Sequence, residues 1–254
     1  MRPAAFLFDL DGTLVDSEML WAQAIVDWLA DRGQKTTVAA FAPVIIGHSW
    51  LDIHATIHAQ FPELGATTAV EDAKVLRPYY DRLATDPVKL VVPGSVAFLK
   101  KVAKIAPCVV VSGSPHADVV AAVDLCGVGG LVKFVLGAED YGRGKPAPDG
   151  FLKAAEMLDV DSSECVVVED SSAGVAAGRA AGMHVIGLDR NLACPQNLAG
   201  CDWLVHDLAE IDVDAVFGDE GRGLKESVQF MLQNSMQKVG HAVKRTLAQK
   251  TDQK

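Results

Sequence analysis

The sequence predicts an α/β fold with a parallel sheet and an all-helical segment inserted after the first strand. Short apolar runs of strand length alternate with helical patterns between residues 88 and 217, an order typical of a parallel sheet covered by helices. Residues 17–87 show only the helical spacing of apolar residues, and a single strand-like run precedes them. The chain of 254 residues is long enough for two domains that each bury a core.

The first apolar run, at residues 4–8, has the length and composition of a buried strand. Gly12 and Thr13 end it, so Asp9 and Asp11 are predicted to project from the carboxyl end of a strand. Ligands bind at that end in open α/β sheets. A turn that uses Asp and Gly for its backbone geometry is the alternative interpretation, and this stretch alone does not decide between the two.

Residues 17–87 are predicted to form a small helical domain. Apolar residues between positions 20 and 29 fall on one helical stripe, and Ser17 is predicted to cap the start of this helix. Helical spacing continues to the end of the segment without convincing period-2 alternation.

Strand and helix patterns alternate in the rest of the chain. Strands are predicted at 108–111, 134–136, 165–168, 184–188 and, at the sheet edge, 203–205, and helices at 95–105, 115–126, 149–158 and 172–181. Asp149 and Ser171 are predicted to cap the last two helices. If residues 4–8 join this sheet, the core is a Rossmann-like three-layer α/β/α domain. The predicted domains are this core (1–16 and 88–217), the helical insertion (17–87), and a linker with a C-terminal amphipathic helix (218–254).

Composition and charge narrow the classes of function. The formal net charge of -10 argues against nucleic acid as the main partner, because phosphate backbones require clustered Lys and Arg. An anionic substrate is still compatible with this net charge, since a pocket can be locally positive in a protein that is negative as a whole. No apolar stretch is long enough to cross a bilayer and no signal-peptide pattern begins the chain, so a cytoplasmic protein without a membrane partner is expected. The C-terminal helix is predicted to pack on the core, to form a dimer contact or to bind a membrane surface, so the chain is expected to be a monomer or a homodimer.

Polar residues follow three further apolar runs of the predicted core. Ser112 follows one strand, Lys145 precedes a helix, and Glu169 and Asp170 follow another strand. Together with the two aspartates of the first loop, they place a hydroxyl, an ammonium and four carboxylates at one edge of the sheet. Phosphoryl transfer uses such a set, because a carboxylate can act as nucleophile, a cation held by carboxylates can offset phosphate charge, and Lys and Ser can bind phosphate oxygens.

These segments, in this order, resemble the four motifs of the haloacid dehalogenase superfamily. The matching segments are DLDGT at 9–13, Ser112, Lys145, and Glu169 with Asp170. Residues 17–87 resemble the inserted cap of the beta-phosphoglucomutase and phosphoglycolate phosphatase branch, to which GKPAPDGF at 144–151 and EDSSAG at 169–174 are especially similar. The resemblance covers nearly the whole chain up to about residue 210.

The resemblance implies roles for individual residues. Asp9 would be the nucleophile, and Asp11 the general acid that later acts as base toward water, which requires Asp11 to hold a proton when the cap closes. Mg²⁺ would be bound by Asp9, Asp170 and the backbone carbonyl of Asp11, while Glu169 is either a further ligand or a residue that only orients the loop. The phosphoryl group would be bound by Ser112, Gly113, Lys145, Gly12 and Thr13; Ser114 is an alternative to Ser112.

The insertion is expected to select the substrate. His48 and Trp50 lie in a segment that resembles the cap loop facing the active site. Sugar-phosphate mutases of the branch carry an Arg at the end of that loop and a His early in the first cap helix, where this chain has Trp50 and Trp21. A phosphatase acting on a small phosphorylated metabolite, such as a sugar phosphate, is therefore favoured over a mutase. Dehalogenation is disfavoured because it needs Asp9 but neither a protonated Asp11 nor a carboxylate for Mg²⁺ at Asp170. A non-catalytic binding module on the same fold is a further alternative.

Overall fold

The computed structural model describes residues 2–46, 48–190 and 195–217. Among the described residues, 3–211 form one compact unit, and Arg2 with 212–217 belongs to a second. Within the second unit, helix α10 (Val213–Phe217) buries the side chains of Val213, Val216 and Phe217. The predicted linker and C-terminal helix at 218–254 lie outside the described residues. Over the described ranges, no helix combines the length and the hydropathy needed to span a bilayer.

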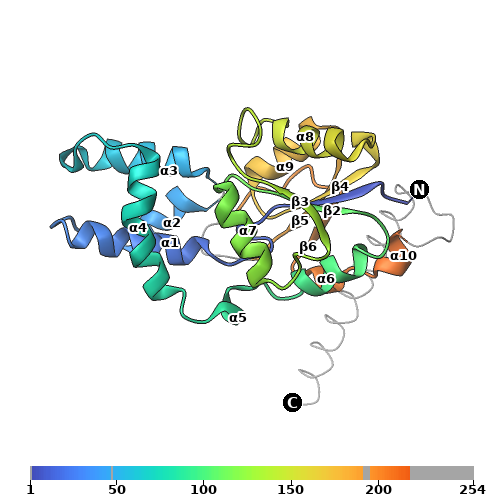
Figure 1. The fold of residues 1–254 in the computed structure, drawn as a ribbon, viewed down its shortest axis with the longest axis horizontal. Coiled ribbons are helices and arrows are strands. Elements are labelled where there is room, and N and C mark those ends of the chain that lie inside the picture. Colours follow the sequence, from blue (N-terminus) through green and yellow to red (C-terminus); the bar gives the residue numbers. More distant parts are fainter. Residues whose placement is uncertain (1, 47, 191–194, 218–254) are drawn as a thin grey trace, which may run out of the picture. The chain divides into compact units, whose positions relative to one another are not determined.

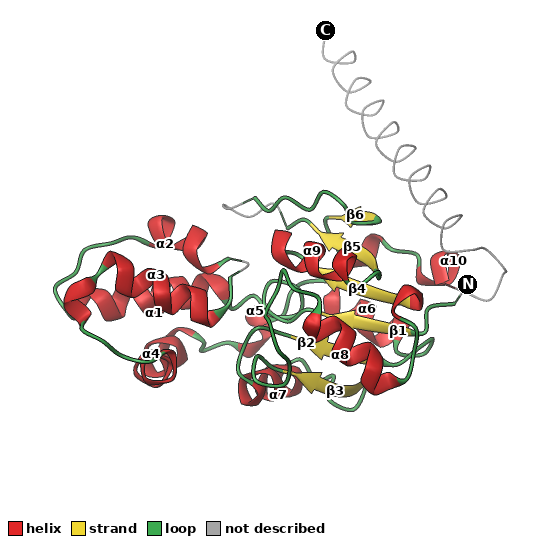
Figure 2. Cartoon of the chain, turned by 90° about the horizontal axis from the view of Figure 1, so that it is seen from above, coloured by secondary structure: helices red, strands yellow, loops and turns green. Residues whose placement is uncertain are grey.

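Six parallel strands form one sheet in the order β3-β2-β1-β4-β5-β6. Their bounds are β1 (Ala5–Phe8), β2 (Cys108–Val111), β3 (Val132–Leu136), β4 (Cys165–Glu169), β5 (His184–Leu188) and β6 (Trp203–Val205). The first strand lies in the middle, with Leu7 aligned to Val109 on one side and to Val167 on the other. Figure 2 shows the strands side by side in this order. The predicted α/β fold with a parallel sheet is confirmed.

Helices cover both faces of the sheet. Successive side chains of each strand point to opposite faces, so apolar side chains lie on both and helices pack against each. They are α6 (Ser95–Val102), α7 (His116–Leu125), α8 (Asp149–Leu158) and α9 (Ser172–Ala180). The rings of Phe6 and Phe8 contact Phe98 of α6, with ring centroids 6.3 and 6.1 Å apart. Leu7 points to the opposite face and packs in one cluster with Phe151 of α8. Figure 1 accordingly shows α8 and α9 on one side of the sheet and α6 on the other.

The helical insertion follows β1 and has its own apolar core. Its helices are α1 (Glu18–Ala30), α2 (Val38–Ile45), α3 (Trp50–Gln60), the 3₁₀ turn η1 (Pro62–Leu64), α4 (Ala69–Leu83) and α5 (Pro87–Leu90). Ile25, Leu29, Phe41, Ile57 and Leu76, from four of these helices, are almost completely buried in one cluster. The all-helical character predicted for this segment agrees with the structure, whereas the proposed domain boundaries at residues 17 and 87 stay a prediction.

Of the three predicted helix caps, Ser171 forms a capping hydrogen bond, Ser17 occupies the N-cap position without one, and Asp149 is not the cap residue. Ser17 precedes α1, but its side chain makes no capping hydrogen bond: its backbone is helical (φ -92°, ψ -25°) instead of extended, and its hydroxyl donates to Asp11. Helix α8 begins at Asp149 itself, whose carboxylate accepts hydrogen bonds from the backbone and guanidinium of Arg143. Ser171 does cap α9, since its hydroxyl accepts a hydrogen bond from the N–H of Gly174 at 3.0 Å.

Candidate active site

Three buried carboxylates meet at the carboxyl ends of the two central strands. Asp9 directly follows β1, and its N–H donates to the carbonyl of Val168 in β4 at 2.9 Å. Glu169 is the last residue of that neighbouring strand, and Asp170 follows it. One carboxylate oxygen from each of the three lies within 4.8 Å of the others, and all three residues are at most 7% exposed. Parallel pairing of β1 with β4 therefore brings together residues about 160 positions apart in the sequence.

Lys145 is the cation that faces these carboxylates. Its ammonium group hydrogen-bonds Asp9 Oδ1, lies 2.6 Å from Glu169 Oε1 and is 3.3 Å from the carbonyl oxygen of Val111 at the end of β2. The ring of Phe151 lies below it, with the nitrogen 5.2 Å from the ring centroid. One lysine thus contacts the ends of three adjacent strands, β2, β1 and β4.

The group carries more negative than positive charge, and the pKa values reflect this. Burial, together with the charges of Glu169 and Asp11, raises the pKa of Asp9 from 3.8 to about 8 against the opposing effect of Lys145. Burial and the charges of Glu169 and Asp9 likewise raise the pKa of Asp170 well above its ordinary value. Burial alone would lower the pKa of Lys145, but the charges of Asp9 and Glu169 outweigh it and raise that pKa. Buried carboxylate oxygens with uncompensated charge fit a hard divalent cation.

Gly12 allows the loop after β1 to approach Asp170. Its φ of 86° lies in the left-handed region, and a Cβ at this position would lie 2.1 Å from Asp170 Oδ2. The hydroxyl of Thr13, which is fully buried, donates to Asp170 Oδ1 at 3.2 Å. Gly12 and Thr13 therefore position Asp170, and the Thr13 side chain has no access to a ligand in this structure.

Three serine hydroxyls hold the carboxylate of Asp11. Ser17 donates to Oδ1, while Ser112 and Ser114 donate to Oδ2 at 3.3 and 2.8 Å. The backbone N–H of Ser114 also donates to the hydroxyl oxygen of Ser112 at 3.0 Å. Ser112 lies in the site as predicted, and Ser114 joins it beside Ser112 instead of replacing it. Sequence reasoning missed the contact of Ser17, for which the pattern held no signal beyond a hydroxyl six residues after Asp11.

A cavity of about 330 Å³ opens above Asp9, Asp11 and Lys145. Its volume lies at the small end of the range for metabolite pockets. Helices of the insertion line the facing side, which includes the predicted His48 and Trp50. The ring of Trp21 stacks on Tyr80, with centroids 4.3 Å apart, and lies 6.1 Å from the ring of Trp50.

The predicted site residues fall into two groups around this cavity. Those that line it are Asp9, Asp11, Ser112, Gly113, Lys145, His48 and Trp50. Those that lie behind its wall are Gly12, Thr13, Glu169 and Asp170. Both oxygens of Glu169 are engaged there: Oε1 by Lys145, and Oε2 by the N–H and hydroxyl of Ser171, each at 2.9 Å. The structure thus brings the predicted residues together, while their chemical roles stay predictions.

Comparisons with known proteins bear on the chemistry of this site. The family model for haloacid dehalogenase-like hydrolases matches residues 3–182. Hexitol phosphatase A of Escherichia coli (strain K12) is 34% identical over 228 residues, which cover 84% of this chain and 95% of that protein. A beta-phosphoglucomutase of Mycobacterium tuberculosis (strain CDC 1551 / Oshkosh) is 32% identical over 237 residues, covering 82% and 90%. The crystal structure of a beta-phosphoglucomutase from Clostridium difficile shares the fold, with a TM-score of 0.72, 22% identity and coverage of 91% and 99%.

Proposed function

Because this chain belongs to the haloacid dehalogenase-like hydrolases, we propose that it hydrolyses the phosphomonoester of a small sugar or sugar alcohol. The observation that supports this most is the pairing of Asp9 with Lys145 at the base of a cavity of about 330 Å³, a size that suits a metabolite. Hexitol phosphatase A is a relative that acts, by its name, on hexitol phosphates. The aromatic rings of Trp21, Trp50 and Tyr80 on the facing wall suit the C–H faces of such a substrate.

The first step is attack by Asp9 on the phosphorus atom. Oδ1 of Asp9 is bound to Lys145, so Oδ2 is the oxygen that attacks, and an aspartyl-phosphate forms as the sugar oxygen leaves. Asp11, two residues on and half-buried in the cavity wall, gives its proton to that leaving oxygen. The same carboxylate then takes a proton from the water that hydrolyses the aspartyl-phosphate.

Ser112 changes its hydrogen bond when substrate binds. A hydroxyl has one proton, and in this structure Ser112 donates it to Asp11. To donate to a phosphate oxygen, Ser112 must release Asp11, which Ser114 and Ser17 continue to hold. The hydroxyl cluster thus keeps the acid oriented while one of its members binds phosphate.

The carboxylate group is proposed to hold Mg²⁺ through Asp9, Asp170 and the backbone carbonyl of Asp11. When bound, this cation offsets the negative charge of the phosphate and of the two carboxylates. Of the two roles left open for Glu169, its full engagement by Lys145 and Ser171 favours positioning of the lysine and the loop over direct metal binding.

Hydrolysis is favoured over mutase activity by the charge on the facing wall. A mutase must bind a bisphosphate and therefore needs a second phosphate site. Besides Lys145, Arg77 is the one Lys or Arg among the described residues that line the cavity. It is held by Asp81 at 2.7 Å and by Asp118 at 2.9 Å, and both carboxylates also line the cavity. A second phosphate at this place would meet two negative charges for one positive charge.

A panel of phosphate esters tests the proposal. With Mg²⁺, the protein is expected to release phosphate from hexitol or hexose phosphates faster than from a generic aryl phosphate, and removal of divalent cations with a chelator is expected to abolish release. No release from any member of the panel would overturn the hydrolase assignment.

The mutase alternative is tested by supplying glucose 1-phosphate with a bisphosphate primer. Conversion to glucose 6-phosphate faster than phosphate release would replace our proposal with that alternative.

Gly12→Ala tests whether the loop after β1 must approach Asp170. The added methyl would collide with the Asp170 carboxylate, so we expect turnover to fall about 100-fold or more, as for an ångström-scale misplacement of a reacting group. Gly65→Ala is the matched control, because Gly65 has a similar φ of 78° with no atom within 4 Å of the added Cβ. Both variants carry a backbone strain of about 1–2 kcal/mol, so both are expected to lose thermal stability. Equal turnover in the two variants would contradict the positioning role of Gly12.

A further inference from the structure

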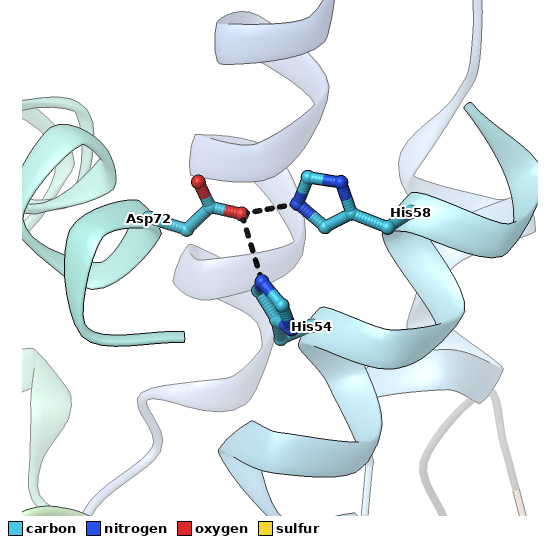
Figure 3. A group of neighbouring side chains, drawn as sticks. All are labelled: His54, His58 and Asp72. Atoms are coloured by element: carbon cyan, nitrogen blue, oxygen red, sulfur yellow. Dashed lines mark hydrogen bonds and ion pairs between the residues drawn. The ribbon is translucent and has the colours of Figure 1, made fainter. Parts of the chain in front are cut away.

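Two histidines and an aspartate form a second cluster of metal-binding side chains, inside the helical insertion. His54 and His58 lie one turn apart on α3, and Asp72 lies in the first turns of α4. Figure 3 shows both imidazole rings directed at one oxygen of the Asp72 carboxylate. The distances from Asp72 Oδ2 are 2.6 Å to His58 Nε2 and 3.6 Å to His54 Nε2. One ligand atom from each residue lies within 4.8 Å of the others.

His54 Nε2 is buried and makes no hydrogen bond with any residue that the structure describes. Its 3.6 Å separation from Asp72 Oδ2 exceeds hydrogen-bond length. Buried polar atoms in proteins nearly always have a partner, so an orphaned nitrogen aimed at a carboxylate needs an explanation. A metal ion between the two atoms would supply the missing partner.

A threonine next to the cluster holds the aspartate in place, and its hydroxyl oxygen also lies 3.0 Å from His58 Nε2. Asp72 is 3% exposed, and its Oδ1 accepts a hydrogen bond from the Thr67 hydroxyl at 2.9 Å. Thr68 and Glu71 form a capping box that sets the start of α4 and hence the position of Asp72. Metal-binding carboxylates are oriented by such outer hydrogen bonds while the second oxygen faces the ion.

We propose that His54, His58 and Asp72 form a binding site for a divalent transition-metal ion of the Zn²⁺ type, separate from the carboxylate site at the sheet edge. Imidazole nitrogens suit Zn²⁺, whereas Mg²⁺ prefers oxygen. Tetrahedral Zn²⁺ with ligands at about 2.0–2.1 Å places neighbouring ligand atoms about 3.4 Å apart. The 3.6 Å pair already has this spacing, and the 2.6 Å pair reaches it when the ion replaces the hydrogen-bonding proton.

The ion would join the two helices that carry much of the facing wall of the cavity. Helix α3 carries Trp50, and α4 carries Arg77 and Tyr80. The indole N–H of Trp50 already donates to the carbonyl of Ala69, the first residue of α4, at 2.7 Å. The metal adds a second link about one helical turn further along α3, so its binding stabilises the insertion and takes no part in the chemical step. This inference is independent of the proposed hydrolase activity.

The test is calorimetric titration of the chelator-treated full chain with Zn²⁺ in the presence of saturating Mg²⁺. We expect a site that persists in Asp170→Asn and loses affinity in His54→Ala and Asp72→Asn by more than the about 10–100-fold cost of losing an outer hydrogen bond. Thr67→Val, which removes that outer bond, is expected to lose about 10–100-fold. His116→Ala is the matched control, since the His116 side chain is 43% exposed and its ring pairs with Asp140, outside this cluster. Its affinity for Zn²⁺ should equal that of the wild type.

Thermal unfolding with Zn²⁺ and the visible absorption of bound Co²⁺ test the same site by two further measurements. Zn²⁺ should raise the Tm of the wild type and of His116→Ala but not that of His54→Gln, which keeps a polar side chain at this position. Co²⁺ should give the visible absorption of a tetrahedral site in the wild type and lose it in His54→Gln. Absence of Zn²⁺ binding to the wild type, or equal Zn²⁺ affinity in the wild type, His54→Ala and Asp72→Asn, would overturn the proposal.

Discussion

Replacing Asp9 with Asn is expected to lower kcat by about 10⁵-fold or more, the scale of loss when a catalytic nucleophile is removed. Asn keeps the shape of the side chain but its amide does not attack phosphorus. The measurement is phosphate release with Mg²⁺ on the best ester of the panel. Asp159→Asn is the matched control, because Asp159 is exposed and its φ of 56° suits Asn as well as Asp. Turnover of Asp9→Asn within about tenfold of the wild type would contradict the nucleophile assignment.

The same substitution is expected to raise the Tm of the metal-free protein at pH 8. The pKa of Asp9 is raised from 3.8 to about 8, mainly by burial, so the folded state binds a proton that the unfolded state has released. The stability that this proton contributes is complete below pH 3.8 and is lost as the pH rises toward 8. Asn does not ionise, so the Tm advantage of Asp9→Asn over the wild type should grow between pH 5 and pH 8. An advantage that is constant across this range would contradict the electrostatic explanation.

A variant such as Asp9→Asn that loses turnover but gains stability identifies the replaced residue as catalytic and not structural. Buried charges that destabilise the fold persist where the chemistry needs them. In the wild type, Mg²⁺ is expected to raise the Tm more at pH 8 than at pH 5, because the cation competes with the protons of Asp9 and Asp170. The Tm of Asp9→Asn should respond less to Mg²⁺ at both pH values.

Much of the site was predictable from the sequence because its residues follow apolar runs of a parallel sheet. Strand β1 lies between β2 and β4, so the residues that follow these three strands lie close together whatever the length or path of the connecting segments. Element boundaries were less predictable. Strand β3 begins at Val132, two residues before the predicted start, because Val132 pairs with Cys108 ahead of an irregularity in the register.

Contacts between side chains of different loops and helices were beyond sequence reasoning. The hydroxyl of Ser17 turns to Asp11 and not to its own helix, a choice that depends on the path of the loop after β1. The cluster of His54, His58 and Asp72 depends on how α3 packs against α4, which helical periodicity does not specify. Periodicity predicts which face of a helix is buried, but not which residues of another helix it meets.

Lys145→Met is expected to cause the largest loss of stability among the single substitutions at this site. The lysine is the cation bound to Asp9 and to Glu169, which is fully buried, and its removal leaves two carboxylates unpaired. Breaking a buried ion pair from one side costs about 3–5 kcal/mol. Lys153→Met is the matched control, because Lys153 pairs with Glu156 on the exposed side of α8, where such pairs contribute about 0–1 kcal/mol. Urea unfolding of the two metal-free variants measures the difference.

Adding Glu169→Gln to Lys145→Met separates the structural role of the lysine from its role in turnover. Gln at 169 removes one unpaired charge and keeps an oxygen for the N–H and hydroxyl of Ser171, so we expect the double variant to regain part of the lost stability. Turnover should stay as low as in Lys145→Met, because the ammonium group that offsets the repulsion between Asp9 and the phosphate is still missing. Recovery of both stability and turnover would show that Lys145 acts only by neutralising Glu169. Recovery of neither would show that the position of Lys145 matters through packing on Phe151 and not through its charge.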